Sequence, residues 1–285
     1  MTTMNLPRPE SFNVDASPVF LATVFKSGTK LLDLIVAELT GLAIDAPAFH
    51  SEPDYEDASP IRFLPGHFFT WHNVPSDAVQ RRIADAGARP IFLVRNIYDL
   101  VVSQYFHFAN DVDAEIGFST GTRDYFAGMN LHAGLSLVIC GATSERFHWS
   151  GYGYYLRQIQ EMLRYAAENP CLVVVYDRLV LNKRVEIQRI ADYLGIQVTP
   201  ERIEAMYQAS SLDSMRQVRA REAGTGAHFR KGMPGDHVNV LAPHHYDMIS
   251  QVKRLFAPDL DSLCRTLGYG DVTAMPETPE PKVEA

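Results

Sequence analysis

Residues 22–32 read ATVFKSGTKLL, and the fold of the whole chain is best approached from this stretch. The apolar run VFLATVF, residues 19–25, ends at the polar turn Lys26-Ser27-Gly28-Thr29-Lys30. Apolar residues then recur at helical spacing, at Leu31, Leu32, Leu34, Ile35, Val36 and Leu39. The pattern predicts a strand, a tight turn and a helix that begins at Thr29.

The turn has the composition of an anion-binding site. The N-terminus of a helix leaves backbone N–H groups unpaired and carries about half a unit of positive charge. Lys26, Ser27 and Thr29 add an ammonium group and two hydroxyls to this end. The triphosphatase pattern GxxxxGK[ST] requires two glycines with the lysine after the second, whereas Lys26 precedes the single glycine here. The turn therefore differs from a standard ATP or GTP loop, and on this stretch alone a ligand-free turn with exposed lysines remains open.

The composition excludes several classes of protein. A chain of 285 residues, 46% of them hydrophobic, can bury a full core, and its net charge of −8 argues against a general nucleic-acid binder. The three cysteines, Cys140, Cys171 and Cys264, lack CxxC spacing, so we expect reduced thiols rather than disulfides or a zinc site. The sequence has neither a signal peptide nor a run of ~20 apolar residues. We expect a cytoplasmic protein without a membrane span.

Strand-like and helix-like segments alternate along the chain. We expect one domain over residues 18–270, with flexible tails at 1–17 and 271–285 because these ends are polar or rich in proline and charge. The expected strands are 19–25, 61–64, 90–94 and 172–176, and the expected helices are 29–39, 76–86, 97–108, 153–168 and 185–194.

The strands are almost wholly apolar, which is typical of a parallel sheet covered on both faces. We therefore predict an α/β, P-loop-like, three-layer fold with a central parallel sheet flanked by helices. Ligands in such folds bind at the carboxyl ends of the strands. Three strands end in polar residues, which we expect to converge: Lys26-Ser27, Arg95-Asn96 and Tyr176-Asp177-Arg178.

Two further segments carry groups that suit anions. Arg95 ends the strand IFLVRN, and Ser103 follows eight residues later within the next expected helix. Near the other end, residues 229–236 read FRKGMPGD, in which Arg230 and Lys231 precede a glycine-rich loop. Taken separately, each also fits an ordinary strand end or a solvated surface loop.

Together, these segments resemble the sulfotransferases that use 3′-phosphoadenosine 5′-phosphosulfate (PAPS). FKSGTKLL resembles their PKSGTTW loop, and LVRNIYDLVVSQYFHF, residues 93–108, resembles their RNPKDVAVSYYHF segment. FRKGMPGD resembles their RKGxxGD loop. VVVYDRLVLNKRVEIQRIADYLGI, residues 173–196, resembles their YEDLKxxPxxEIxKIAxFLG stretch. The order and spacing of the four motifs agree over residues 18–240.

The resemblance implies PAPS as donor, 3′-phosphoadenosine 5′-phosphate (PAP) as product, and a set of residues that bind them. The phosphosulfate loop corresponds to Lys26, Ser27, Gly28, Thr29 and Lys30. The 3′-phosphate site corresponds to Arg95 and Ser103, with Arg230, Lys231 and Gly232 in the loop that closes over it. The positions near the adenine correspond to Tyr176 and Ser210.

Several positions depart from the family pattern. The second threonine of the loop is Lys30, and the tryptophan that stacks on adenine is Leu31. We therefore expect the adenine to be held more by shape than by stacking. The Glu-Asp pair after Tyr176 is Asp177-Arg178, and the tryptophan after RKGxxGD is His237. These departures are typical of divergent, bacterial members.

Sulfuryl transfer requires a base for the acceptor hydroxyl, and histidine suits this role near neutral pH. The family has its base in a KTHLP or GHLP segment, and residues 63–75 read FLPGHFFTWHNVP. Gly66-His67-Phe68 fits the GHL form, so His67 is the expected base. His72 is the alternative, because its distance along the chain to Arg95 is closer to that in the animal enzymes.

Lysines are expected to stabilise the charge that develops during transfer. Lys26 would act on the bridging oxygen of the departing nucleotide. The animal enzymes have a second lysine two residues before the histidine, where Pro65 stands before His67, and we hypothesise that Lys30 supplies part of the missing charge. No metal is expected, because lysines and the helix end neutralise the sulfate. We expect His244-His245, which follow a proline, to lie on the surface and not to bind a ligand.

The leading hypothesis is thus an enzyme that sulfates a hydroxyl of a small or medium acceptor. The alternatives are a P-loop nucleotide phosphotransferase (a kinase) and a catalytically inactive PAPS-binding protein. Residues 109–150 are expected to cover the acceptor site. The sequence leaves open whether the acceptor is a phenol, a lipid alcohol, a sugar or a carrier-bound hydroxyl, and it leaves the oligomeric state open.

Overall fold

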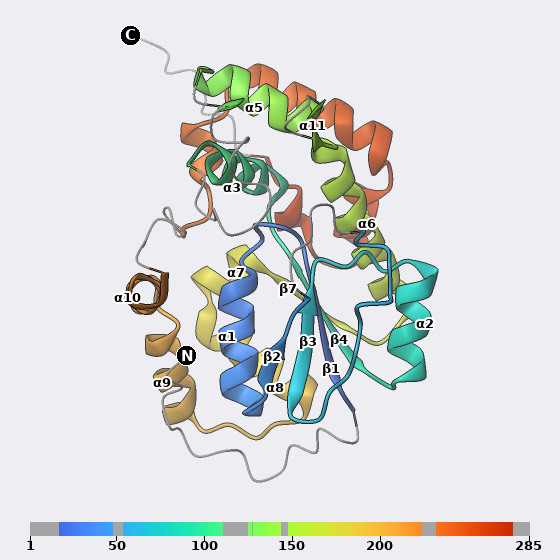
Figure 1. Ribbon diagram of the computed structural model, residues 1–285, viewed down its shortest axis with the longest axis vertical. Helices are drawn as coiled ribbons and strands as arrows, with labels where there is room; N and C mark the ends of the chain where they lie inside the picture. The colour runs from blue at the N-terminus through green and yellow to red at the C-terminus, as the bar shows by residue number, and fades with distance from the viewer. Residues whose placement is uncertain are drawn as a thin grey trace.

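The computed structural model describes residues 17–47, 54–110, 125–126, 128–143, 148–223 and 232–275. At its centre lies a five-stranded parallel sheet in the order β2-β3-β1-β4-β7 (Figure 1). The strands are β1 (Val19–Thr23), β2 (Ala43–Asp45), β3 (His67–Trp71), β4 (Arg89–Val94) and β7 (Leu172–Val175). The predicted parallel sheet flanked by helices is confirmed.

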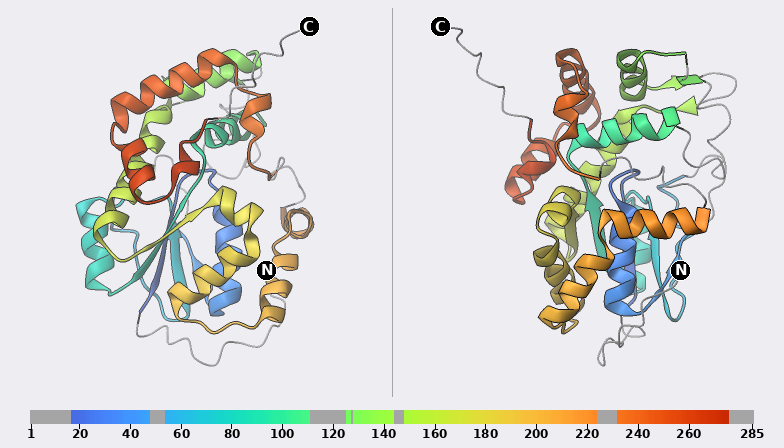
Figure 2. Two further views of the ribbon diagram at one scale, coloured as in Figure 1. Left: turned by 180° about the vertical axis from the view of Figure 1, so that it is seen from behind. Right: turned by 90° about the vertical axis from the view of Figure 1, so that its left-hand side faces the viewer.

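Both faces of the sheet are covered, which explains the apolar strands. Val19 and Leu21 of β1 belong to a core shared with α1 (Thr29–Thr40) and α8 (Lys183–Leu194). Phe20 and Ala22 of the same strand belong to a core shared with α2 (Asp77–Asp85) and α6 (Tyr152–Glu168). In the view from behind in Figure 2, α7 (Tyr176–Leu181) and α8 lie beside α1.

A further group of helices lies beyond the carboxyl ends of the strands. Figure 1 shows α3 (Ile97–Asn110), α5 (Leu131–Cys140) and α11 (Pro243–Phe256) gathered there. The remaining elements are α9 (Pro200–Ala209), α10 (Leu212–Ala223), α12 (Leu260–Thr266), the 3₁₀ helices η2 (Asp236–Asn239) and η3 (Gly270–Val272), and the antiparallel strands β5 (Ala142–Thr143) and β6 (His148–Trp149).

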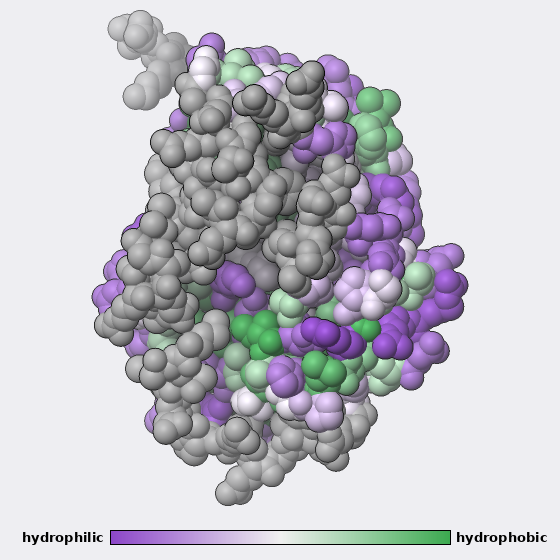
Figure 3. All heavy atoms as spheres, viewed as in Figure 1, coloured by the Kyte–Doolittle hydropathy of each residue, from purple (hydrophilic) through white to green (hydrophobic). Residues whose placement is uncertain are grey.

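Short polar side chains fix the ends of the predicted helices. The Ser76 hydroxyl accepts a hydrogen bond from the amide of Val79 and begins α2. The Asn96 side chain accepts bonds from the amides of Tyr98 and Asp99 and begins α3. At the surface, α2 buries Val79 and Ile83 and turns charged residues outward, and hydrophilic residues predominate where it lies at the right-hand edge of Figure 3.

Two boundaries expected from the sequence are wrong. No strand forms over residues 61–64, and the strand that follows in this region is β3. Tyr176 begins α7 instead of ending the preceding strand. Because Phe68, Phe69 and Trp71 are aromatic and buried, this segment suits an inner strand with both faces covered.

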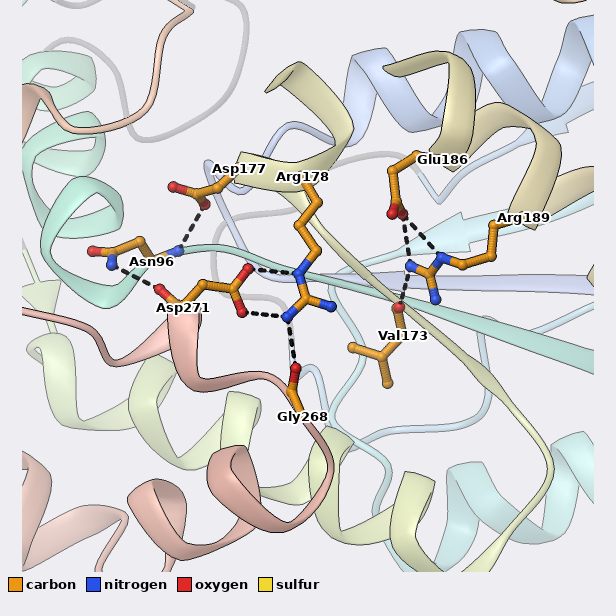
Figure 4. Close-up of polar contacts among 8 residues, drawn as sticks. All are labelled: Asn96, Val173, Asp177, Arg178, Glu186, Arg189, Gly268 and Asp271. Carbon is orange, nitrogen blue, oxygen red and sulfur yellow. Dashed lines mark hydrogen bonds and ion pairs between the residues drawn. The ribbon is translucent and has the colours of Figure 1, made fainter. Parts of the chain in front are cut away.

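The C-terminal segment is held to the body beyond residue 270. The guanidinium of Arg178 donates to both carboxylate oxygens of Asp271, at 2.6 and 2.7 Å, and to the Gly268 carbonyl at 2.6 Å (Figure 4). The side-chain amide of Asn96 donates hydrogen bonds to the backbone carbonyls of Asp271 and Ala274. These contacts lie at the start of the segment 271–285 that was expected to be a flexible tail, whereas residues 1–16 and 276–285 lie outside the described residues. No helix among the described residues has both the length and the apolar character to cross a membrane.

Candidate functional site

The turn between β1 and α1 has an unusual backbone. Lys26 has a φ of 69°, and within the described chain it is the one residue other than glycine with a positive φ. Gly28 follows with a φ of 108°. A lysine in this left-handed region is strained, and such strain is typical of ligand-binding turns. The Ser27 hydroxyl is buried and has no hydrogen-bond partner in the structure.

Tyr176 packs directly on this turn. A Cβ atom on residue 28 would lie 2.3 Å from Cδ2 and 2.6 Å from Cε2 of Tyr176, so only glycine fits there. The Tyr176 hydroxyl donates a hydrogen bond to the carbonyl of Gly232 at 3.0 Å. Tyr176 thus joins the turn to the loop that begins at Gly232.

Arg95 reaches the same point from the end of β4. Its Nη1 donates to the carbonyl of Lys26 at 3.2 Å, and its guanidinium carbon lies 4.5 Å from the centre of the Tyr176 ring. Its Nε is buried without a partner. The predicted convergence of the three strand ends is confirmed. Because a buried donor without a partner costs about 1–3 kcal/mol, Arg95 Nε and Ser27 Oγ are suited to receive oxyanion oxygens.

Other polar residues at these strand ends form hydrogen bonds within the protein. The carboxylate of Asp177 accepts a bond from the backbone amide of Asn96 at 3.1 Å, and Arg178 turns toward Asp271 (Figure 4). In the same view, Arg189 pairs with Glu186 and donates to the carbonyl of Val173, fastening α8 to β7.

The loop after Gly232 is fastened to α3 by one buried carboxylate. Asp99 accepts hydrogen bonds from the amides of Gly235, at 2.5 Å, and His237, at 3.0 Å. Sequence analysis did not assign Asp99 a role in this loop. Arg230 and Lys231, which were expected to close over the donor, lie outside the described residues.

The two candidate bases lie at opposite ends of β3. His67 is its first residue, and its Nδ1 lies 2.9 Å from the carbonyl of Pro65. Since a strand rises about 3.3 Å per residue, His67 lies roughly 16 Å along the strand from His72. The structure therefore does not bring His67, the expected base, to the turn. It brings the alternative, His72, which follows the carboxyl end of β3.

His72 is connected to the turn by hydrogen bonds. Its Nδ1 lies 3.0 Å from both the carbonyl oxygen and the hydroxyl of Thr23, and that hydroxyl lies 2.8 Å from the hydroxyl of Thr29. Because a carbonyl oxygen only accepts, Nδ1 carries the proton and the lone pair of the neutral ring is on Nε2.

The surroundings of His72 favour its neutral form. Burial lowers the pKa of His72 to about 4, and the charges of Lys30 and Lys26 act in the same direction, while the bond with the Thr23 backbone opposes them. The ring is therefore neutral at physiological pH, the state that a general base requires.

Lys26 and His107 lie side by side near His72. Lys26 Nζ lies 3.4 Å from Nδ1 of His107, and the Phe25 ring contacts both His107 and His72, with centroid distances of 5.1 and 5.7 Å. Aromatic side chains continue from this ring in a set of mutual contacts: Tyr55, Trp71, Phe108, Trp149, Tyr154 and Tyr155.

Lys30 has a partner that the sequence analysis missed. Its Nζ lies 3.9 Å from a carboxylate oxygen of Asp33, one turn further along α1. Asp33 is buried, and neither of its oxygens accepts a hydrogen bond. Burial raises the pKa of Asp33 to about 6, while Lys30 and the neighbouring Thr70 hydroxyl lower it. The spacing of three residues on a helix could have predicted the contact between Lys30 and Asp33. The same spacing does not predict that the carboxyl group of Asp33 is buried.

The other two serines of the expected donor site, Ser103 and Ser210, differ in their surroundings. Ser103 is half-buried in α3, the helix that Arg95 precedes. Ser210 follows the last residue of α9, and its hydroxyl donates hydrogen bonds to the carbonyls of Met206 and Tyr207. Leu212, two residues later, lies against Gly232.

The fold and this site define a class: an α/β protein of the P-loop type, with a strained turn and buried donors for an oxyanion at the strand ends. Comparison with known proteins narrows the class to one family. The sulfotransferase domain matches residues 16–263, which is most of the chain. The chain therefore belongs to the PAPS-dependent sulfotransferase family, and it is an enzyme of that family rather than a P-loop kinase.

Known members are distant relatives. Sulfotransferase 1A1 of Bos taurus is 24% identical over 250 residues, covering 80% of this chain and 79% of the relative. A crystal structure of mouse sulfotransferase SULT7A1 complexed with PAP has a TM-score of 0.65 and 17% identity, over 90% of each chain. Retinol dehydratase in complex with androsterone and inactive cofactor PAP has a TM-score of 0.57 and 16% identity, over 88% of this chain and 82% of that chain. These structural similarities support the fold.

Proposed function

We propose that the protein transfers the sulfuryl group of PAPS to a hydroxyl of a small or medium apolar acceptor, with His72 as the general base. The observation that carries this proposal is the chain of contacts from His72 through Thr23 to Thr29. It joins a neutral imidazole to the turn that is suited to the donor's phosphosulfate.

The donor fits the groups left unpaired at the strand ends. The 5′-phosphosulfate would lie on the turn. There, the backbone amides at the start of α1 and the Ser27 hydroxyl, which has no partner in the structure, are suited to bind an anion. The 3′-phosphate would lie between Arg95 and Ser103, with Arg230 and Lys231 closing over it. Two proteins of similar fold were crystallised with PAP, which supports this choice of ligand.

The residues perform the reaction by positioning and charge. His72 keeps its Nδ1–H on the Thr23 carbonyl and accepts the acceptor's proton at Nε2. The acceptor oxygen then bonds to sulfur as the bond from sulfur to the bridging oxygen of PAP breaks, roughly in line. Lys26 stabilises the charge that grows on that oxygen.

Lys30 supplies a second positive charge. With His72 as base, the residue two positions before it is Thr70, so the family's second lysine is absent here too. Lys30 lies beside Asp33 and the Thr70 hydroxyl, and its charge reaches His72. We propose that Asp33, a buried carboxylate, orients Lys30 toward the transferred group.

The acceptor side is apolar. Aromatic rings pack around His72 and His107, with Phe25 in contact with both, and such surroundings favour a ring-containing alcohol or phenol over a sugar. Retinol dehydratase, of similar fold, was crystallised with androsterone, which agrees with an apolar acceptor.

A screen with labelled PAPS tests the proposal. Panels of phenols, sterols, linear alcohols and sugars are supplied at equal concentration, and transfer of label is measured. We expect transfer to ring-containing alcohols or phenols. Binding of PAP without transfer to any acceptor would instead support the inactive PAPS-binding alternative.

A further inference from the structure

We propose that His132, His244 and His245 form a binding site for one borderline divalent metal ion, of which Zn²⁺ is the representative case. His132 belongs to the first turn of α5, and His244 and His245 belong to the first turn of α11. These two helices pack against each other (Figure 1). They contribute none of the residues assigned above to donor binding or catalysis.

The three rings converge closely. One potential ligand atom from each residue lies within 4.8 Å of those of the other two. The ring centroids are 4.0 Å apart for His244 and His245, 5.4 Å for His132 and His245, and 5.9 Å for His132 and His244. In a tetrahedral site with Zn–N bonds of 2.0–2.1 Å, ligand nitrogens are about 3.4 Å apart. His132 and His244 are exposed, so rotation of their side chains can shorten the distances between ligand atoms from within 4.8 Å to about 3.4 Å.

The buried member of the group is already oriented. His245 Nδ1 accepts a hydrogen bond from the amide of Ala242 at 3.0 Å, and Nε2 lies 3.2 Å from the carbonyl of His132. An amide donates and a carbonyl accepts, so His245 is a neutral ring with its proton on Nε2. A metal at Nδ1 would replace the Ala242 amide. The bond from Nε2–H to the carbonyl would remain, and this is the usual outer partner of a metal-bound histidine.

A metal-bound histidine must be in its neutral form, and the two hydrogen bonds of His245 are those of a neutral ring. Neutral imidazoles suit Zn²⁺, Cu²⁺ and Ni²⁺ rather than Mg²⁺ or Ca²⁺. With solvent as the fourth ligand, the ion would cross-link α5 to α11.

Titration of the whole, untagged chain with ZnCl₂ tests the site by calorimetry, after treatment with a chelator and its removal. We expect one equivalent bound with a dissociation constant in the micromolar range or below. His132→Ala and His244→Ala should each weaken binding at least tenfold. MgCl₂ should give no binding heat.

Two matched variants serve as controls. His148→Ala removes another exposed histidine, and Cys140→Ser removes an exposed thiol; both should bind Zn²⁺ within twofold of the wild type. Co²⁺ should give the visible absorption of a four-coordinate site in the wild type and lose it in His132→Ala. The proposal is overturned if the wild type binds no Zn²⁺, or if His132→Ala and His244→Ala bind it as tightly as the wild type.

Discussion

The imidazole Nδ1 of His72 lies 3.0 Å from the carbonyl oxygen of Thr23, the last residue of β1. This contact joins two neighbouring strands at their carboxyl ends, beside the turn that begins at Lys26. It fixes the tautomer of His72 and thereby assigns the lone pair to Nε2. The proposed catalytic role of His72 depends on this relationship.

Replacement of His72 should abolish most of the turnover. His72→Ala should lower kcat by about 10²- to 10⁴-fold, the usual contribution of a general base. PAP affinity, measured by calorimetry, should change less than threefold, because His72 is assigned no contact with the donor. His67→Ala is the matched control and should retain the wild-type kcat. Loss of activity in His67→Ala alone would restore His67 as the base.

The pH dependence of the rate should reflect the low pKa of His72. Because the pKa of His72 is lowered to about 4, its neutral form persists down to that pH. We expect no loss of kcat/KM attributable to His72 between pH 8 and 6. An ascending limb of kcat/KM centred near pH 6.5 in the wild type would contradict the assignment.

The stability of the protein should depend on pH through His72 as well. The pKa of the folded state lies below the value of about 6.5 expected for an unfolded chain, so the unfolded state binds more protons between pH 4 and 6.5. The contribution of His72 to the free energy of unfolding is therefore present above pH 6.5 and lost as pH falls toward 4. Urea unfolding of wild type and His72→Gln, compared from pH 7.5 to 4.5, measures this difference.

Asp33→Asn should stabilise the fold and impair the reaction. The pKa of Asp33 is raised from 3.8 to about 6, so its ionisation disfavours the folded state above pH 6 and has no effect below pH 4. The variant should gain on the order of 2–3 kcal/mol at pH 7.5 and almost nothing at pH 4. Since Lys30 loses the carboxylate that orients it, kcat should fall.

Lys30→Met tests the same pair from the other side. Lower charge at the transferred group should reduce kcat about tenfold or more, with a smaller change in the KM for the acceptor. An unchanged rate would remove both Lys30 and Asp33 from the proposed mechanism and leave His72 and Lys26 untouched.

Gly28→Ala should prevent the turn from closing on Tyr176. A Cβ there would lie 2.3 Å from the Tyr176 ring, and the φ of 108° adds strain. PAP affinity should fall by more than tenfold. Gly87→Ala is the control, because Gly87 also has a positive φ, 58°, but has open space around it. If both variants lost affinity equally, the contact with Tyr176 would not be the cause.

The sequence predicted the sheet and the turn between β1 and α1 because both depend on local patterns. Apolar runs bounded by glycine and polar residues define β1, β4 and β7, and the polar ends of these strands converge as parallel order requires. The extent of the domain, 18–270, and the cytoplasmic location stay predictions.

The sequence left open those features that depend on tertiary arrangement. His67 and His72 flank one apolar run, and a short motif match could not tell which end of the strand each occupies. Burial of Asp33 depends on tertiary packing, which also places the Thr70 hydroxyl of β3 beside its carboxyl group. His132 meets His245 across 113 residues of sequence, so no spacing rule could associate them.

The most direct test of the central claim compares PAP with adenosine 5′-monophosphate, which lacks the 3′-phosphate, by calorimetry on wild type and Arg95→Ala. The wild type should bind PAP at least 100-fold more tightly, because charge-assisted bonds to a phosphate are strong. Arg95→Ala should lose most of that preference while its weaker affinity for the monophosphate changes little. Equal binding of the two nucleotides by the wild type, or an undiminished preference in Arg95→Ala, would contradict a donor gripped at the strand ends by its 3′-phosphate.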